Sequence, residues 1–278
     1  MSVLPPKVIS YGVRDNQKLN VVQCAKCSLV YLDNHNHISD EHYENSGMHG
    51  NQMSSLDDWL NDTSIDDTRR FNELYSLIKN ANVVDVGCGN GGFLSKCIGH
   101  AKSIKGIELE NRVINYWKDQ IQIEKTFSNN DNNFDLFTAF HLLEHIKDPI
   151  SFLSNIRNKM SDNSILVIEV PNYDDALIKT YKLKSFKKFT FWSQHLYYYS
   201  PKTLKNILRI SGFKVKKINQ IQRYPLSNHL YWLCKGTPGG HNKWNFLNNT
   251  QISRAYEKLL QNLSQCDTLL GYFVKDGK

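Results

Sequence analysis

Apolar residues recur at helical spacing in the stretch that precedes the first glycine-rich turn. Between residues 55 and 80, the apolar positions Phe71, Leu74, Tyr75 and Ile78 repeat at helical spacing. The spacing predicts a helix that Asn80 can end.

From residue 82 the pattern changes to short apolar runs of strand type that alternate with helical segments. The predicted strands are NVVDVG (82–87), SIKGIEL (103–109), FDLFTAF (134–140) and SILVIEV (164–170), and the predicted helices are GGFLSKCIG (91–99), ENRVINYWKDQ (110–120) and DPISFLSNIRNKM (148–160). Alternation at this spacing predicts a parallel sheet with crossover helices.

The C-terminal part continues with one well-marked helix. Ser200 can cap it, Pro201 suits its first turn and Gly212 follows its end. The other elements predicted there are a strand over 213–221, a helix around 253–263 and a last strand over 267–275.

These patterns suggest five parts, of which the first, residues 1–45, looks irregular. The predicted parts are an N-terminal extension (1–45), a helical cap (46–80), a core (81–221), a substrate-side insert (222–265) and the last strand of the core sheet (266–278).

The net charge of +7 is unevenly distributed along the 278 residues. From Tyr181 to Lys278 there are 17 Lys and Arg but 3 Asp and Glu, whereas the first 180 residues carry 17 and 24. A basic C-terminal third favours an anionic partner, such as a phosphorylated metabolite, a nucleotide-sugar or a nucleic acid. A solvated lysine face is the alternative.

Several classes of protein are disfavoured by the sequence. There is no apolar run of 18 residues to cross a membrane, and the first residues lack the pattern of a signal peptide. Six cysteines without regular spacing do not suggest a disulfide framework. We therefore expect a soluble cytoplasmic protein with a small-molecule partner.

The stretch VVDVGCGNGGFL (83–94) ends a predicted strand in an acid and a glycine-rich turn. Glycines allow close approach of a ligand, and the start of the next helix offers backbone N–H groups. The Gly-Lys-Ser/Thr of a P-loop is missing, and the GxGxxG spacing of Gly87, Gly89 and Gly92 is weak evidence by itself.

The acid inside this motif, Asp85, is more informative than the glycine spacing. DVGCGNGGFL resembles the first motif of class I S-adenosylmethionine-dependent methyltransferases, and KGIELENRVI (105–114) resembles the next. The resemblance implies that the loop wraps the methionine part of the cofactor, which Asp85 helps to hold. It also implies that Glu108, 23 residues later, binds both ribose hydroxyls. An ordinary acid at a strand end is the alternative.

A third stretch, FDLFTAFHLLEHIKDPISFL (134–153), resembles the fourth-strand segment of the same family and would place Phe140 and His141 near the cofactor sulfur. The acid that usually contacts adenine is not evident, and Asn129, Asn130 or Asp131 could substitute. The cofactor residues implied are Asp85, Gly87, Cys88, Gly89, Gly91, Glu108, Leu109, Phe140 and His141.

The resemblance covers residues 70–221 and implies an α/β, Rossmann-like fold. We expect a seven-stranded, mostly parallel sheet with helices on both faces, a small N-terminal extension and a C-terminal insert. The last strand, near Leu269 to Val274, should run antiparallel at or near the sheet edge. The helix over Asp66 to Ile78 should cover a cofactor cleft at the carboxyl ends of the strands.

His141, Glu144 and His145 form an HxxEH pattern with several interpretations. It matches the zinc motif of inverted metalloproteases, but that leaves the glycine loop unexplained. It also resembles ubiquinone-pathway O-methyltransferases, whose acid and Glu-His bind a divalent ion; His141 replaces that acid here, so a metal at Glu144 and His145 is not favoured. One histidine could instead be a general base for a hydroxyl acceptor, or His145 could be a satisfied polar residue.

His195, in WSQHLYYYS, is the other candidate base. In related enzymes this segment lines the acceptor pocket, which makes Tyr198 a candidate substrate contact. The insert adds Arg223, His229 and His241 as candidate substrate residues. It is similar to segments in methyltransferases of bacterial surface-carbohydrate pathways, and a packed β-hairpin cover is the alternative.

Cys24-x-x-Cys27 is a single CxxC pair. Bacterial sugar methyltransferases often begin with two such pairs that hold zinc, but the first pair is missing here. His35 and His37 could complete four ligands, although HxH is an unusual spacing. Zinc at Cys24 and Cys27 is therefore possible but not favoured over a reduced, unliganded pair.

Together these features predict an S-adenosylmethionine-dependent methyltransferase. It would transfer a methyl group to a hydroxyl of a small anionic carbohydrate or nucleotide-linked metabolite, in surface-polysaccharide biosynthesis. The rivals are an RNA methyltransferase that uses the basic C-terminal third, the metalloprotease, and a silent binding protein that keeps the fold. Nucleic acid is disfavoured because no RNA-binding module is evident.

Overall fold

The computed structural model describes residues 5–44, 54–129 and 131–277 of the chain. The beginning of the expected cap, residues 46–53, and the adenine candidate Asn130 lie outside these residues. Within the described residues, no helix is both long and apolar enough to cross a membrane.

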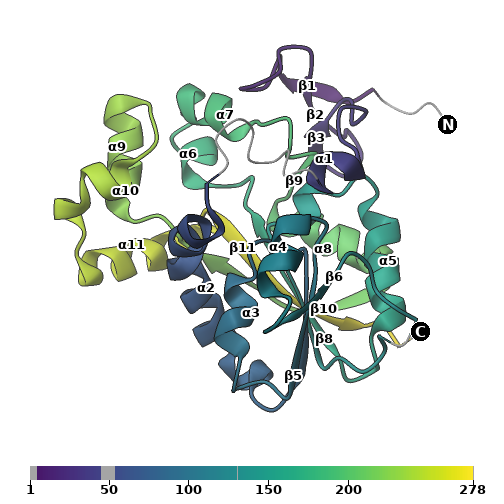
Figure 1. Cartoon of the computed structure of the whole chain (residues 1–278). Coiled ribbons are helices and arrows are strands. Elements are labelled where there is room, and N and C mark those ends of the chain that lie inside the picture. The colour runs from purple at the N-terminus through teal and green to yellow at the C-terminus, as the bar shows by residue number, and fades with distance from the viewer. Residues whose placement is uncertain (1–4, 45–53, 130, 278) are drawn as a thin grey trace.

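A seven-stranded sheet forms the centre of the molecule, as predicted (Figure 1). Its strands are β4 (Asn82–Val86), β5 (Ser103–Ile107), β6 (Gln122–Glu124), β7 (Leu136–Phe140), β8 (Ile165–Pro171), β10 (Phe213–Ile221) and β11 (Thr268–Lys275). Their order is β10-β11-β8-β7-β4-β5-β6, and the pairs from β8 to β6 are parallel. The last strand, β11, is antiparallel to β10 and β8 and lies next to the edge, which confirms its predicted place.

Helices cover both faces of this sheet, because its central strands are apolar on both sides. One face carries α2 (Leu56–Ile78), α3 (Gly92–Cys97) and α4 (Asn111–Trp117), which share a core with residues such as Val83 and Leu136. The other face carries α5 (Pro149–Lys159) and α8 (Pro201–Ile210), which pack on residues such as Phe137. The predicted α/β fold is therefore confirmed.

The start of α8 shows how local sequence sets an element boundary. The Ser200 hydroxyl accepts a hydrogen bond from the Thr203 amide, and the Thr203 hydroxyl accepts one from the Ser200 amide. Pro201 lies in the first turn, where it loses no helical hydrogen bond.

The N-terminal extension is more regular than predicted. Strands β1 (Lys7–Ser10), β2 (Val21–Gln23) and β3 (Val30–Leu32) form an antiparallel sheet that β9 (Tyr197–Tyr198) completes. These strands are so short that the sequence shows no alternation of apolar and polar residues along them. Their buried side chains form a separate core with Phe191, Leu196 and Tyr198, so this sheet is attached to the segment after β8. The short helix α1 (Asp40–Glu44) follows.

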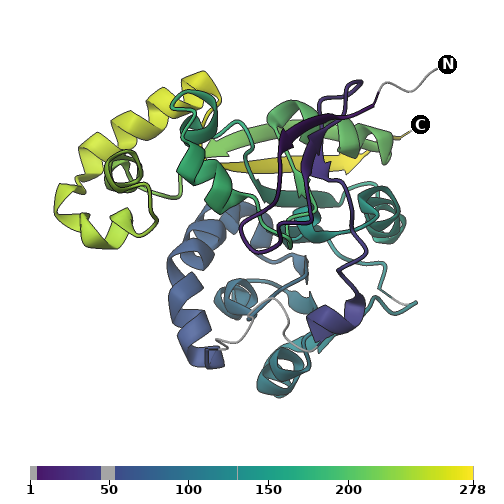
Figure 2. The same cartoon turned by 90° about the horizontal axis from the view of Figure 1, so that it is seen from above.

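The C-terminal insert is helical, so the alternative of a β-hairpin cover is wrong. It contains α9 (Leu226–Lys235), α10 (Gly240–Lys243), η3 (Asn245–Leu247) and α11 (Thr250–Leu263). Figure 2 shows these helices as a lobe beside the sheet, near the two short helices α6 (Ala176–Lys179) and α7 (Lys184–Thr190).

Candidate active site

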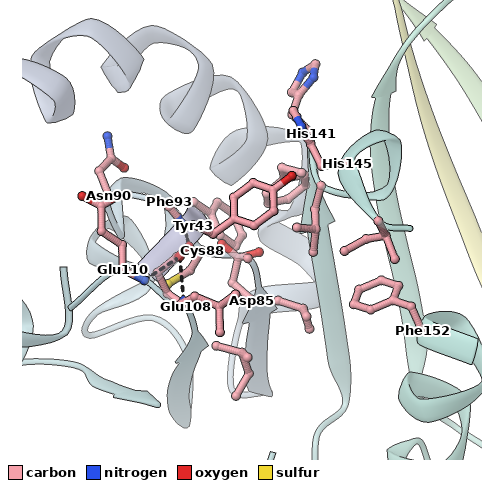
Figure 3. Close-up of a pocket in the computed structure, with 18 of the residues that line it drawn as sticks. Tyr43, Asp85, Cys88, Asn90, Phe93, Glu108, Glu110, His141, His145 and Phe152 are labelled. Atoms are coloured by element: carbon pink, nitrogen blue, oxygen red, sulfur yellow. Dashed lines mark hydrogen bonds between the residues drawn. The ribbon is translucent and has the colours of Figure 1, made fainter. Parts of the chain in front are cut away.

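A cavity of about 920 Å³ lies at the carboxyl ends of the central strands. Its lining includes Asp85 near the end of β4, Gly87 after β4, Glu108 after β5 and His141 after β7. Helix α2 covers it through residues between Trp59 and Arg70, so the predicted cap helix lies over the cleft. The N-terminal segment adds Ile38, Ser39 and Tyr43 to its wall. In Figure 3, Asp85 and Glu108 lie to one side of the Tyr43 ring, and His141 and His145 lie to the other.

The glycine loop shapes the floor of this cavity. Gly87 (φ 68°) and Gly89 (φ 53°) adopt a left-handed conformation that costs a residue with a side chain free energy. The loop is tied to β5 because the amides of Gly87 and Cys88 donate to the Ile107 carbonyl at 2.7 and 3.1 Å. A Cβ at Gly87 would lie 2.7 Å from Leu142, whereas a Cβ at Gly89 would meet only the Trp59 ring, at 3.5 Å. The backbone at Gly89 is thus open to a ligand.

Glu108 is held at the loop by backbone N–H groups. Its Oε2 accepts from Gly89 at 2.9 Å, and its Oε1 accepts from Leu109 at 2.7 Å and Glu110 at 3.1 Å (Figure 3). Burial raises the pKa of Glu108, and these three hydrogen bonds oppose the rise. The carboxylate is therefore fixed in orientation while it still lines the cavity.

Asp85 lies deeper, at the end of β4, and is 2% exposed. The Thr138 hydroxyl donates to its Oδ1 at 2.7 Å. Burial raises the pKa of Asp85 to about 7, and the Thr138 hydrogen bond opposes this. A cationic group in the cavity would therefore favour the ionised form of this side chain.

A buried set of charges joins α2 to the end of β8. Glu169 is fully buried and accepts from Arg69 Nη2 at 2.8 Å and from Arg70 Nε and Nη2 at 3.0 and 2.7 Å. Burial would raise the pKa of Glu169, but Arg70, His141 and Arg69 hold it well below its usual value. Arg70 also reaches Asp67 at 3.2 Å. These contacts hold α2 above the cavity.

Sequence reasoning missed these residues, although two of their pairs were visible. Asp66 with Arg69 and Asp67 with Arg70 stand three apart on one helix, and each pair forms an ion pair. The partner Glu169 appeared only as an acid inside an apolar run.

His141 connects this charge set to the cavity. It has a left-handed backbone (φ 51°), and its Nδ1 lies 3.3 Å from Glu144 Oε1. Its Nε2 lies 3.0 Å from Arg223 Nη1 and 3.3 Å from Glu169 Oε1. Burial and Arg223 lower the pKa of His141, but the hydrogen bonds to Glu144 and Glu169 outweigh them, so the pKa is raised.

Arg223 lines the cavity from the start of the insert. Its guanidinium forms an ion pair with Asp66 of α2, in which Nε lies 3.0 Å from Oδ2. This pair joins the insert to the cap helix above the cavity.

His145 also lines the cavity, and its ring orientation is fixed. Its Nδ1 lies 2.8 Å from the Gln194 carbonyl, which can only accept, so the Nδ1 carries the proton and Nε2 has a lone pair. Burial lowers the pKa of His145, which keeps the ring neutral near pH 7.

Five predicted site residues lie elsewhere. The turn residue Gly91 packs against the Trp117 indole, beside the loop and not in the cavity. His195 lies behind His145, with ring centroids 4.9 Å apart. Tyr198 is buried in the core of the N-terminal sheet, where its hydroxyl bonds the Trp192 backbone. The other two belong to the helical insert, where His229 bonds Tyr256 and His241 approaches Asn228. The remaining predicted cofactor residues, including Cys88, Leu109 and Phe140, do line the cavity.

The structure gives the cysteine pair no further ligands. Cys24 and Cys27 form no disulfide with each other and lie in the turn between β2 and β3. His35 and His37 follow β3, at the other end of the hairpin. Among the described residues, only Glu144, His145 and His195 form a group of three that could hold a metal ion. The four residues considered as a possible but not favoured zinc set, Cys24, Cys27, His35 and His37, are therefore not brought together.

The structure also places the two described residues that the sequence offered for adenine contacts, Asn129 and Asp131. Asp131 is engaged by Lys105, whose Nζ lies 2.8 Å from Oδ2, and Asn129 is exposed. Neither residue lines the cavity.

A sheet of this order, with a glycine loop and an acid at the ends of its first two parallel strands, defines a class I methyltransferase fold. The model of the family described as "Methyltransferase domain" matches residues 59–218, more than half of the chain. The chain belongs to this family.

Curated relatives and solved structures agree with this class. The chain is 24% identical over 173 residues to the ubiquinone biosynthesis O-methyltransferase of Acinetobacter baylyi, covering 55% of this chain and 71% of the relative. It is 23% identical over 222 residues to that of Neisseria meningitidis serogroup C, covering 72% and 87%. These names do not support the sugar methyltransferases that the sequence resembles.

Two solved structures show the same fold. An S-adenosylmethionine-dependent methyltransferase from Archaeoglobus fulgidus has a TM-score of 0.51 at 23% identity, covering 74% of this chain and 92% of that chain. One from Mesorhizobium loti has a TM-score of 0.50 at 15% identity, covering 74% and 96%.

Proposed function

We propose that the protein is an S-adenosylmethionine-dependent O-methyltransferase that acts on a hydroxyl of a small acceptor. The observation that carries this proposal is the cavity in which the open Gly89 backbone, Glu108 and Asp85 face one space. Family membership supports methyl transfer, and the names of the curated relatives support oxygen as the methylated atom.

The residues present fit the cofactor. Glu108 presents two carboxylate oxygens at the loop, as two neighbouring ribose hydroxyls require. Oε2 accepts one backbone N–H and has capacity for a further hydrogen bond, whereas a hydroxyl at Oε1 would replace the longer of its two contacts, the one from Glu110 at 3.1 Å. Asp85 lies where an ammonium group would favour its ionised form. The open space above Gly89 admits a ligand close to the backbone. When bound, the cofactor would supply a methyl group on a sulfonium, which an acceptor oxygen can attack.

We assign the acceptor's proton to His141. The Glu144 carboxylate takes the Nδ1–H at 3.3 Å, which leaves Nε2 as the basic nitrogen. This nitrogen faces the Arg223 N–H at 3.0 Å, so acceptor binding would have to replace that contact. The acceptor hydroxyl would give its proton to Nε2, and its oxygen would form the new bond to the methyl carbon while the sulfur–carbon bond of the cofactor breaks. The products would be a methyl ether and the thioether S-adenosylhomocysteine.

The acceptor class rests on two different observations. Ubiquinone is itself a methoxylated quinone, so the relatives' names favour a ring hydroxyl. The half-buried Arg223 at the cavity wall favours an acceptor that also carries an anionic group, and this would suit an anionic carbohydrate as well. We therefore place a hydroxylated aromatic acid first and an anionic sugar second.

The experiment is a transfer assay with methyl-labelled S-adenosylmethionine and two acceptor panels, dihydroxybenzoates and nucleotide-sugars. Transfer to an oxygen of either panel that Glu108→Ala abolishes would support the proposal, and the panel that reacts identifies the acceptor class. Transfer only to nitrogen or to RNA would contradict it.

A further inference from the structure

Three side chains beside the cavity direct atoms that could coordinate a metal toward one another. No hydrogen bond joins these atoms. Glu144, His145 and His195 each offer one such atom, and these atoms lie within 4.8 Å of one another. Glu144 and His145 are 1% and 6% exposed. They come from the η2 turn (Leu143–His145) and from the segment before β9, which are joined by the hydrogen bond from the Leu196 amide to the Glu144 carbonyl at 2.8 Å.

Two of the polar atoms in this cluster are orphaned. Glu144 Oε2 and His195 Nδ1 are buried and have no hydrogen-bond partner. A buried polar atom without a partner destabilises the folded protein, and more so when it is charged. The other carboxylate oxygen of Glu144 already faces His141, so it is Oε2 that lacks a partner.

The third side chain is prepared in the manner of a metal ligand. A ligating histidine usually donates its second ring N–H to a carbonyl or carboxylate, which fixes its orientation. His145 does this through Nδ1 and the Gln194 carbonyl, at 2.8 Å. Its Nε2 is consequently left with a lone pair, as a ligand requires.

From these contacts we infer that Glu144, His145 and His195 bind a divalent transition-metal ion at the wall of the cavity. Two imidazoles and one carboxylate favour an ion such as Zn²⁺ or Fe²⁺ over Mg²⁺, which prefers oxygen ligands. The sequence pattern around residue 141 disfavoured a metal because His141 stands there, but the third ligand is His195, which lies 50 residues beyond His145. His141 instead turns toward Arg223 and Glu169.

The geometry requires a small contraction. Bond lengths of about 2.0–2.2 Å and a tetrahedral arrangement place ligand atoms roughly 3.3 Å apart. Atoms that are now within 4.8 Å therefore need to approach by at most about 1.5 Å, which side-chain rotation can supply. Three protein ligands leave a position for water or for an oxygen of a bound molecule.

The test is zinc retention by the untagged full-length chain. The background protein carries Cys24→Ser and Cys27→Ser, so that this half-buried thiol pair cannot hold zinc. After removal of metals with a chelator, Zn²⁺ is titrated and the bound ion is measured by mass spectrometry after gel filtration. We expect one ion per chain. His195→Gln and Glu144→Gln should each weaken binding by at least about tenfold.

Two controls separate loss of a ligand from loss of the fold. His100→Gln removes an exposed histidine that is outside the cluster, and it should leave zinc binding unchanged. His195→Gln should keep the affinity for S-adenosylhomocysteine, because His195 does not line the cavity. Co²⁺ should also give a visible absorption band that His195→Gln removes.

The result that overturns the inference is equally specific. If the background protein retains no zinc, the cluster is a polar pocket that water alone fills. Equal retention by His195→Gln, or displacement of Zn²⁺ by Mg²⁺ at similar concentration, would also contradict it. None of these outcomes depends on an acceptor, so failure here would leave the proposed methyl transfer untouched.

Discussion

Glu108→Gln is the sharpest perturbation of the proposed cofactor site. The substitution keeps the size of the side chain, but it replaces one carboxylate oxygen with an NH₂ group. In the protein, Oε2 accepts from Gly89, and Oε1 accepts from Leu109 and Glu110. The glutamine amide has one oxygen that can accept backbone N–H bonds on one side, but its NH₂ group would face N–H donors on the other side. It also carries no charge to strengthen hydrogen bonds from hydroxyl donors.

The expected loss follows from the hydrogen bonds that disappear. A hydrogen bond to a charged group contributes about 1.5–3 kcal/mol, and one of the two ribose contacts must be lost. Part of this is offset because the buried carboxylate no longer has to be kept ionised, since burial raises its pKa. We therefore predict a loss of about 1.4–2.8 kcal/mol, which corresponds to a 10- to 100-fold weaker affinity.

The assay is titration calorimetry with S-adenosylhomocysteine. The matched control is Glu124→Gln, which removes a neighbouring acid that pairs with Lys105 and does not line the cavity. It should bind within about twofold of the wild type. If Glu108→Gln binds as tightly as the wild type, or if both variants lose affinity equally, the ribose role of Glu108 is refuted.

Four further predictions test other parts of the site and its loop. Because the pKa of Asp85 is raised to about 7, the affinity for S-adenosylhomocysteine should rise with pH up to tenfold per unit below pH 7, and Asp85→Asn should flatten this dependence in calorimetry. For the same reason the unliganded wild type should lose stability relative to Asp85→Asn as pH rises from about 4 to 7, which urea unfolding can detect. Gly91→Ala should lower the free energy of unfolding by roughly 1–3 kcal/mol, because φ is 79° and the new Cβ would overlap the Trp117 indole; an unchanged unfolding midpoint would contradict this. His141→Asn should lower kcat and remove its increase with pH above 6.5, since the pKa of His141 is raised and only the neutral ring accepts a proton; an unchanged pH profile would exclude it as the base.

The core of the fold was predictable because its signals are local. Strand and helix runs, the Ser200 cap and the glycine turn each follow from a few neighbouring residues. The N-terminal sheet was missed because β1 to β3 have four residues or fewer and their partner, β9, comes from far along the chain. Only folding brings such strands together.

The residues of the site likewise divide into those with a local sequence signal and those without one. Asp85 and Glu108 belong to motifs at strand ends, so their place at the cavity followed from the order of strands. Arg70 and Glu169 meet from elements 99 residues apart, and neither belongs to a motif. His195 and Tyr198 were assigned to the acceptor side, but the strand β9 turns Tyr198 into the N-terminal core and leaves His195 behind His145.

The central claim is that one cavity holds a sulfonium nucleoside between Asp85 and Glu108. A crystal structure with S-adenosylhomocysteine tests it most directly. The account predicts that both ribose hydroxyls bond Glu108 and that the amino-acid end lies above Gly89 next to Asp85. Nucleoside density elsewhere, or a cavity closed by the Trp59 and Tyr43 rings at saturating ligand, would contradict it.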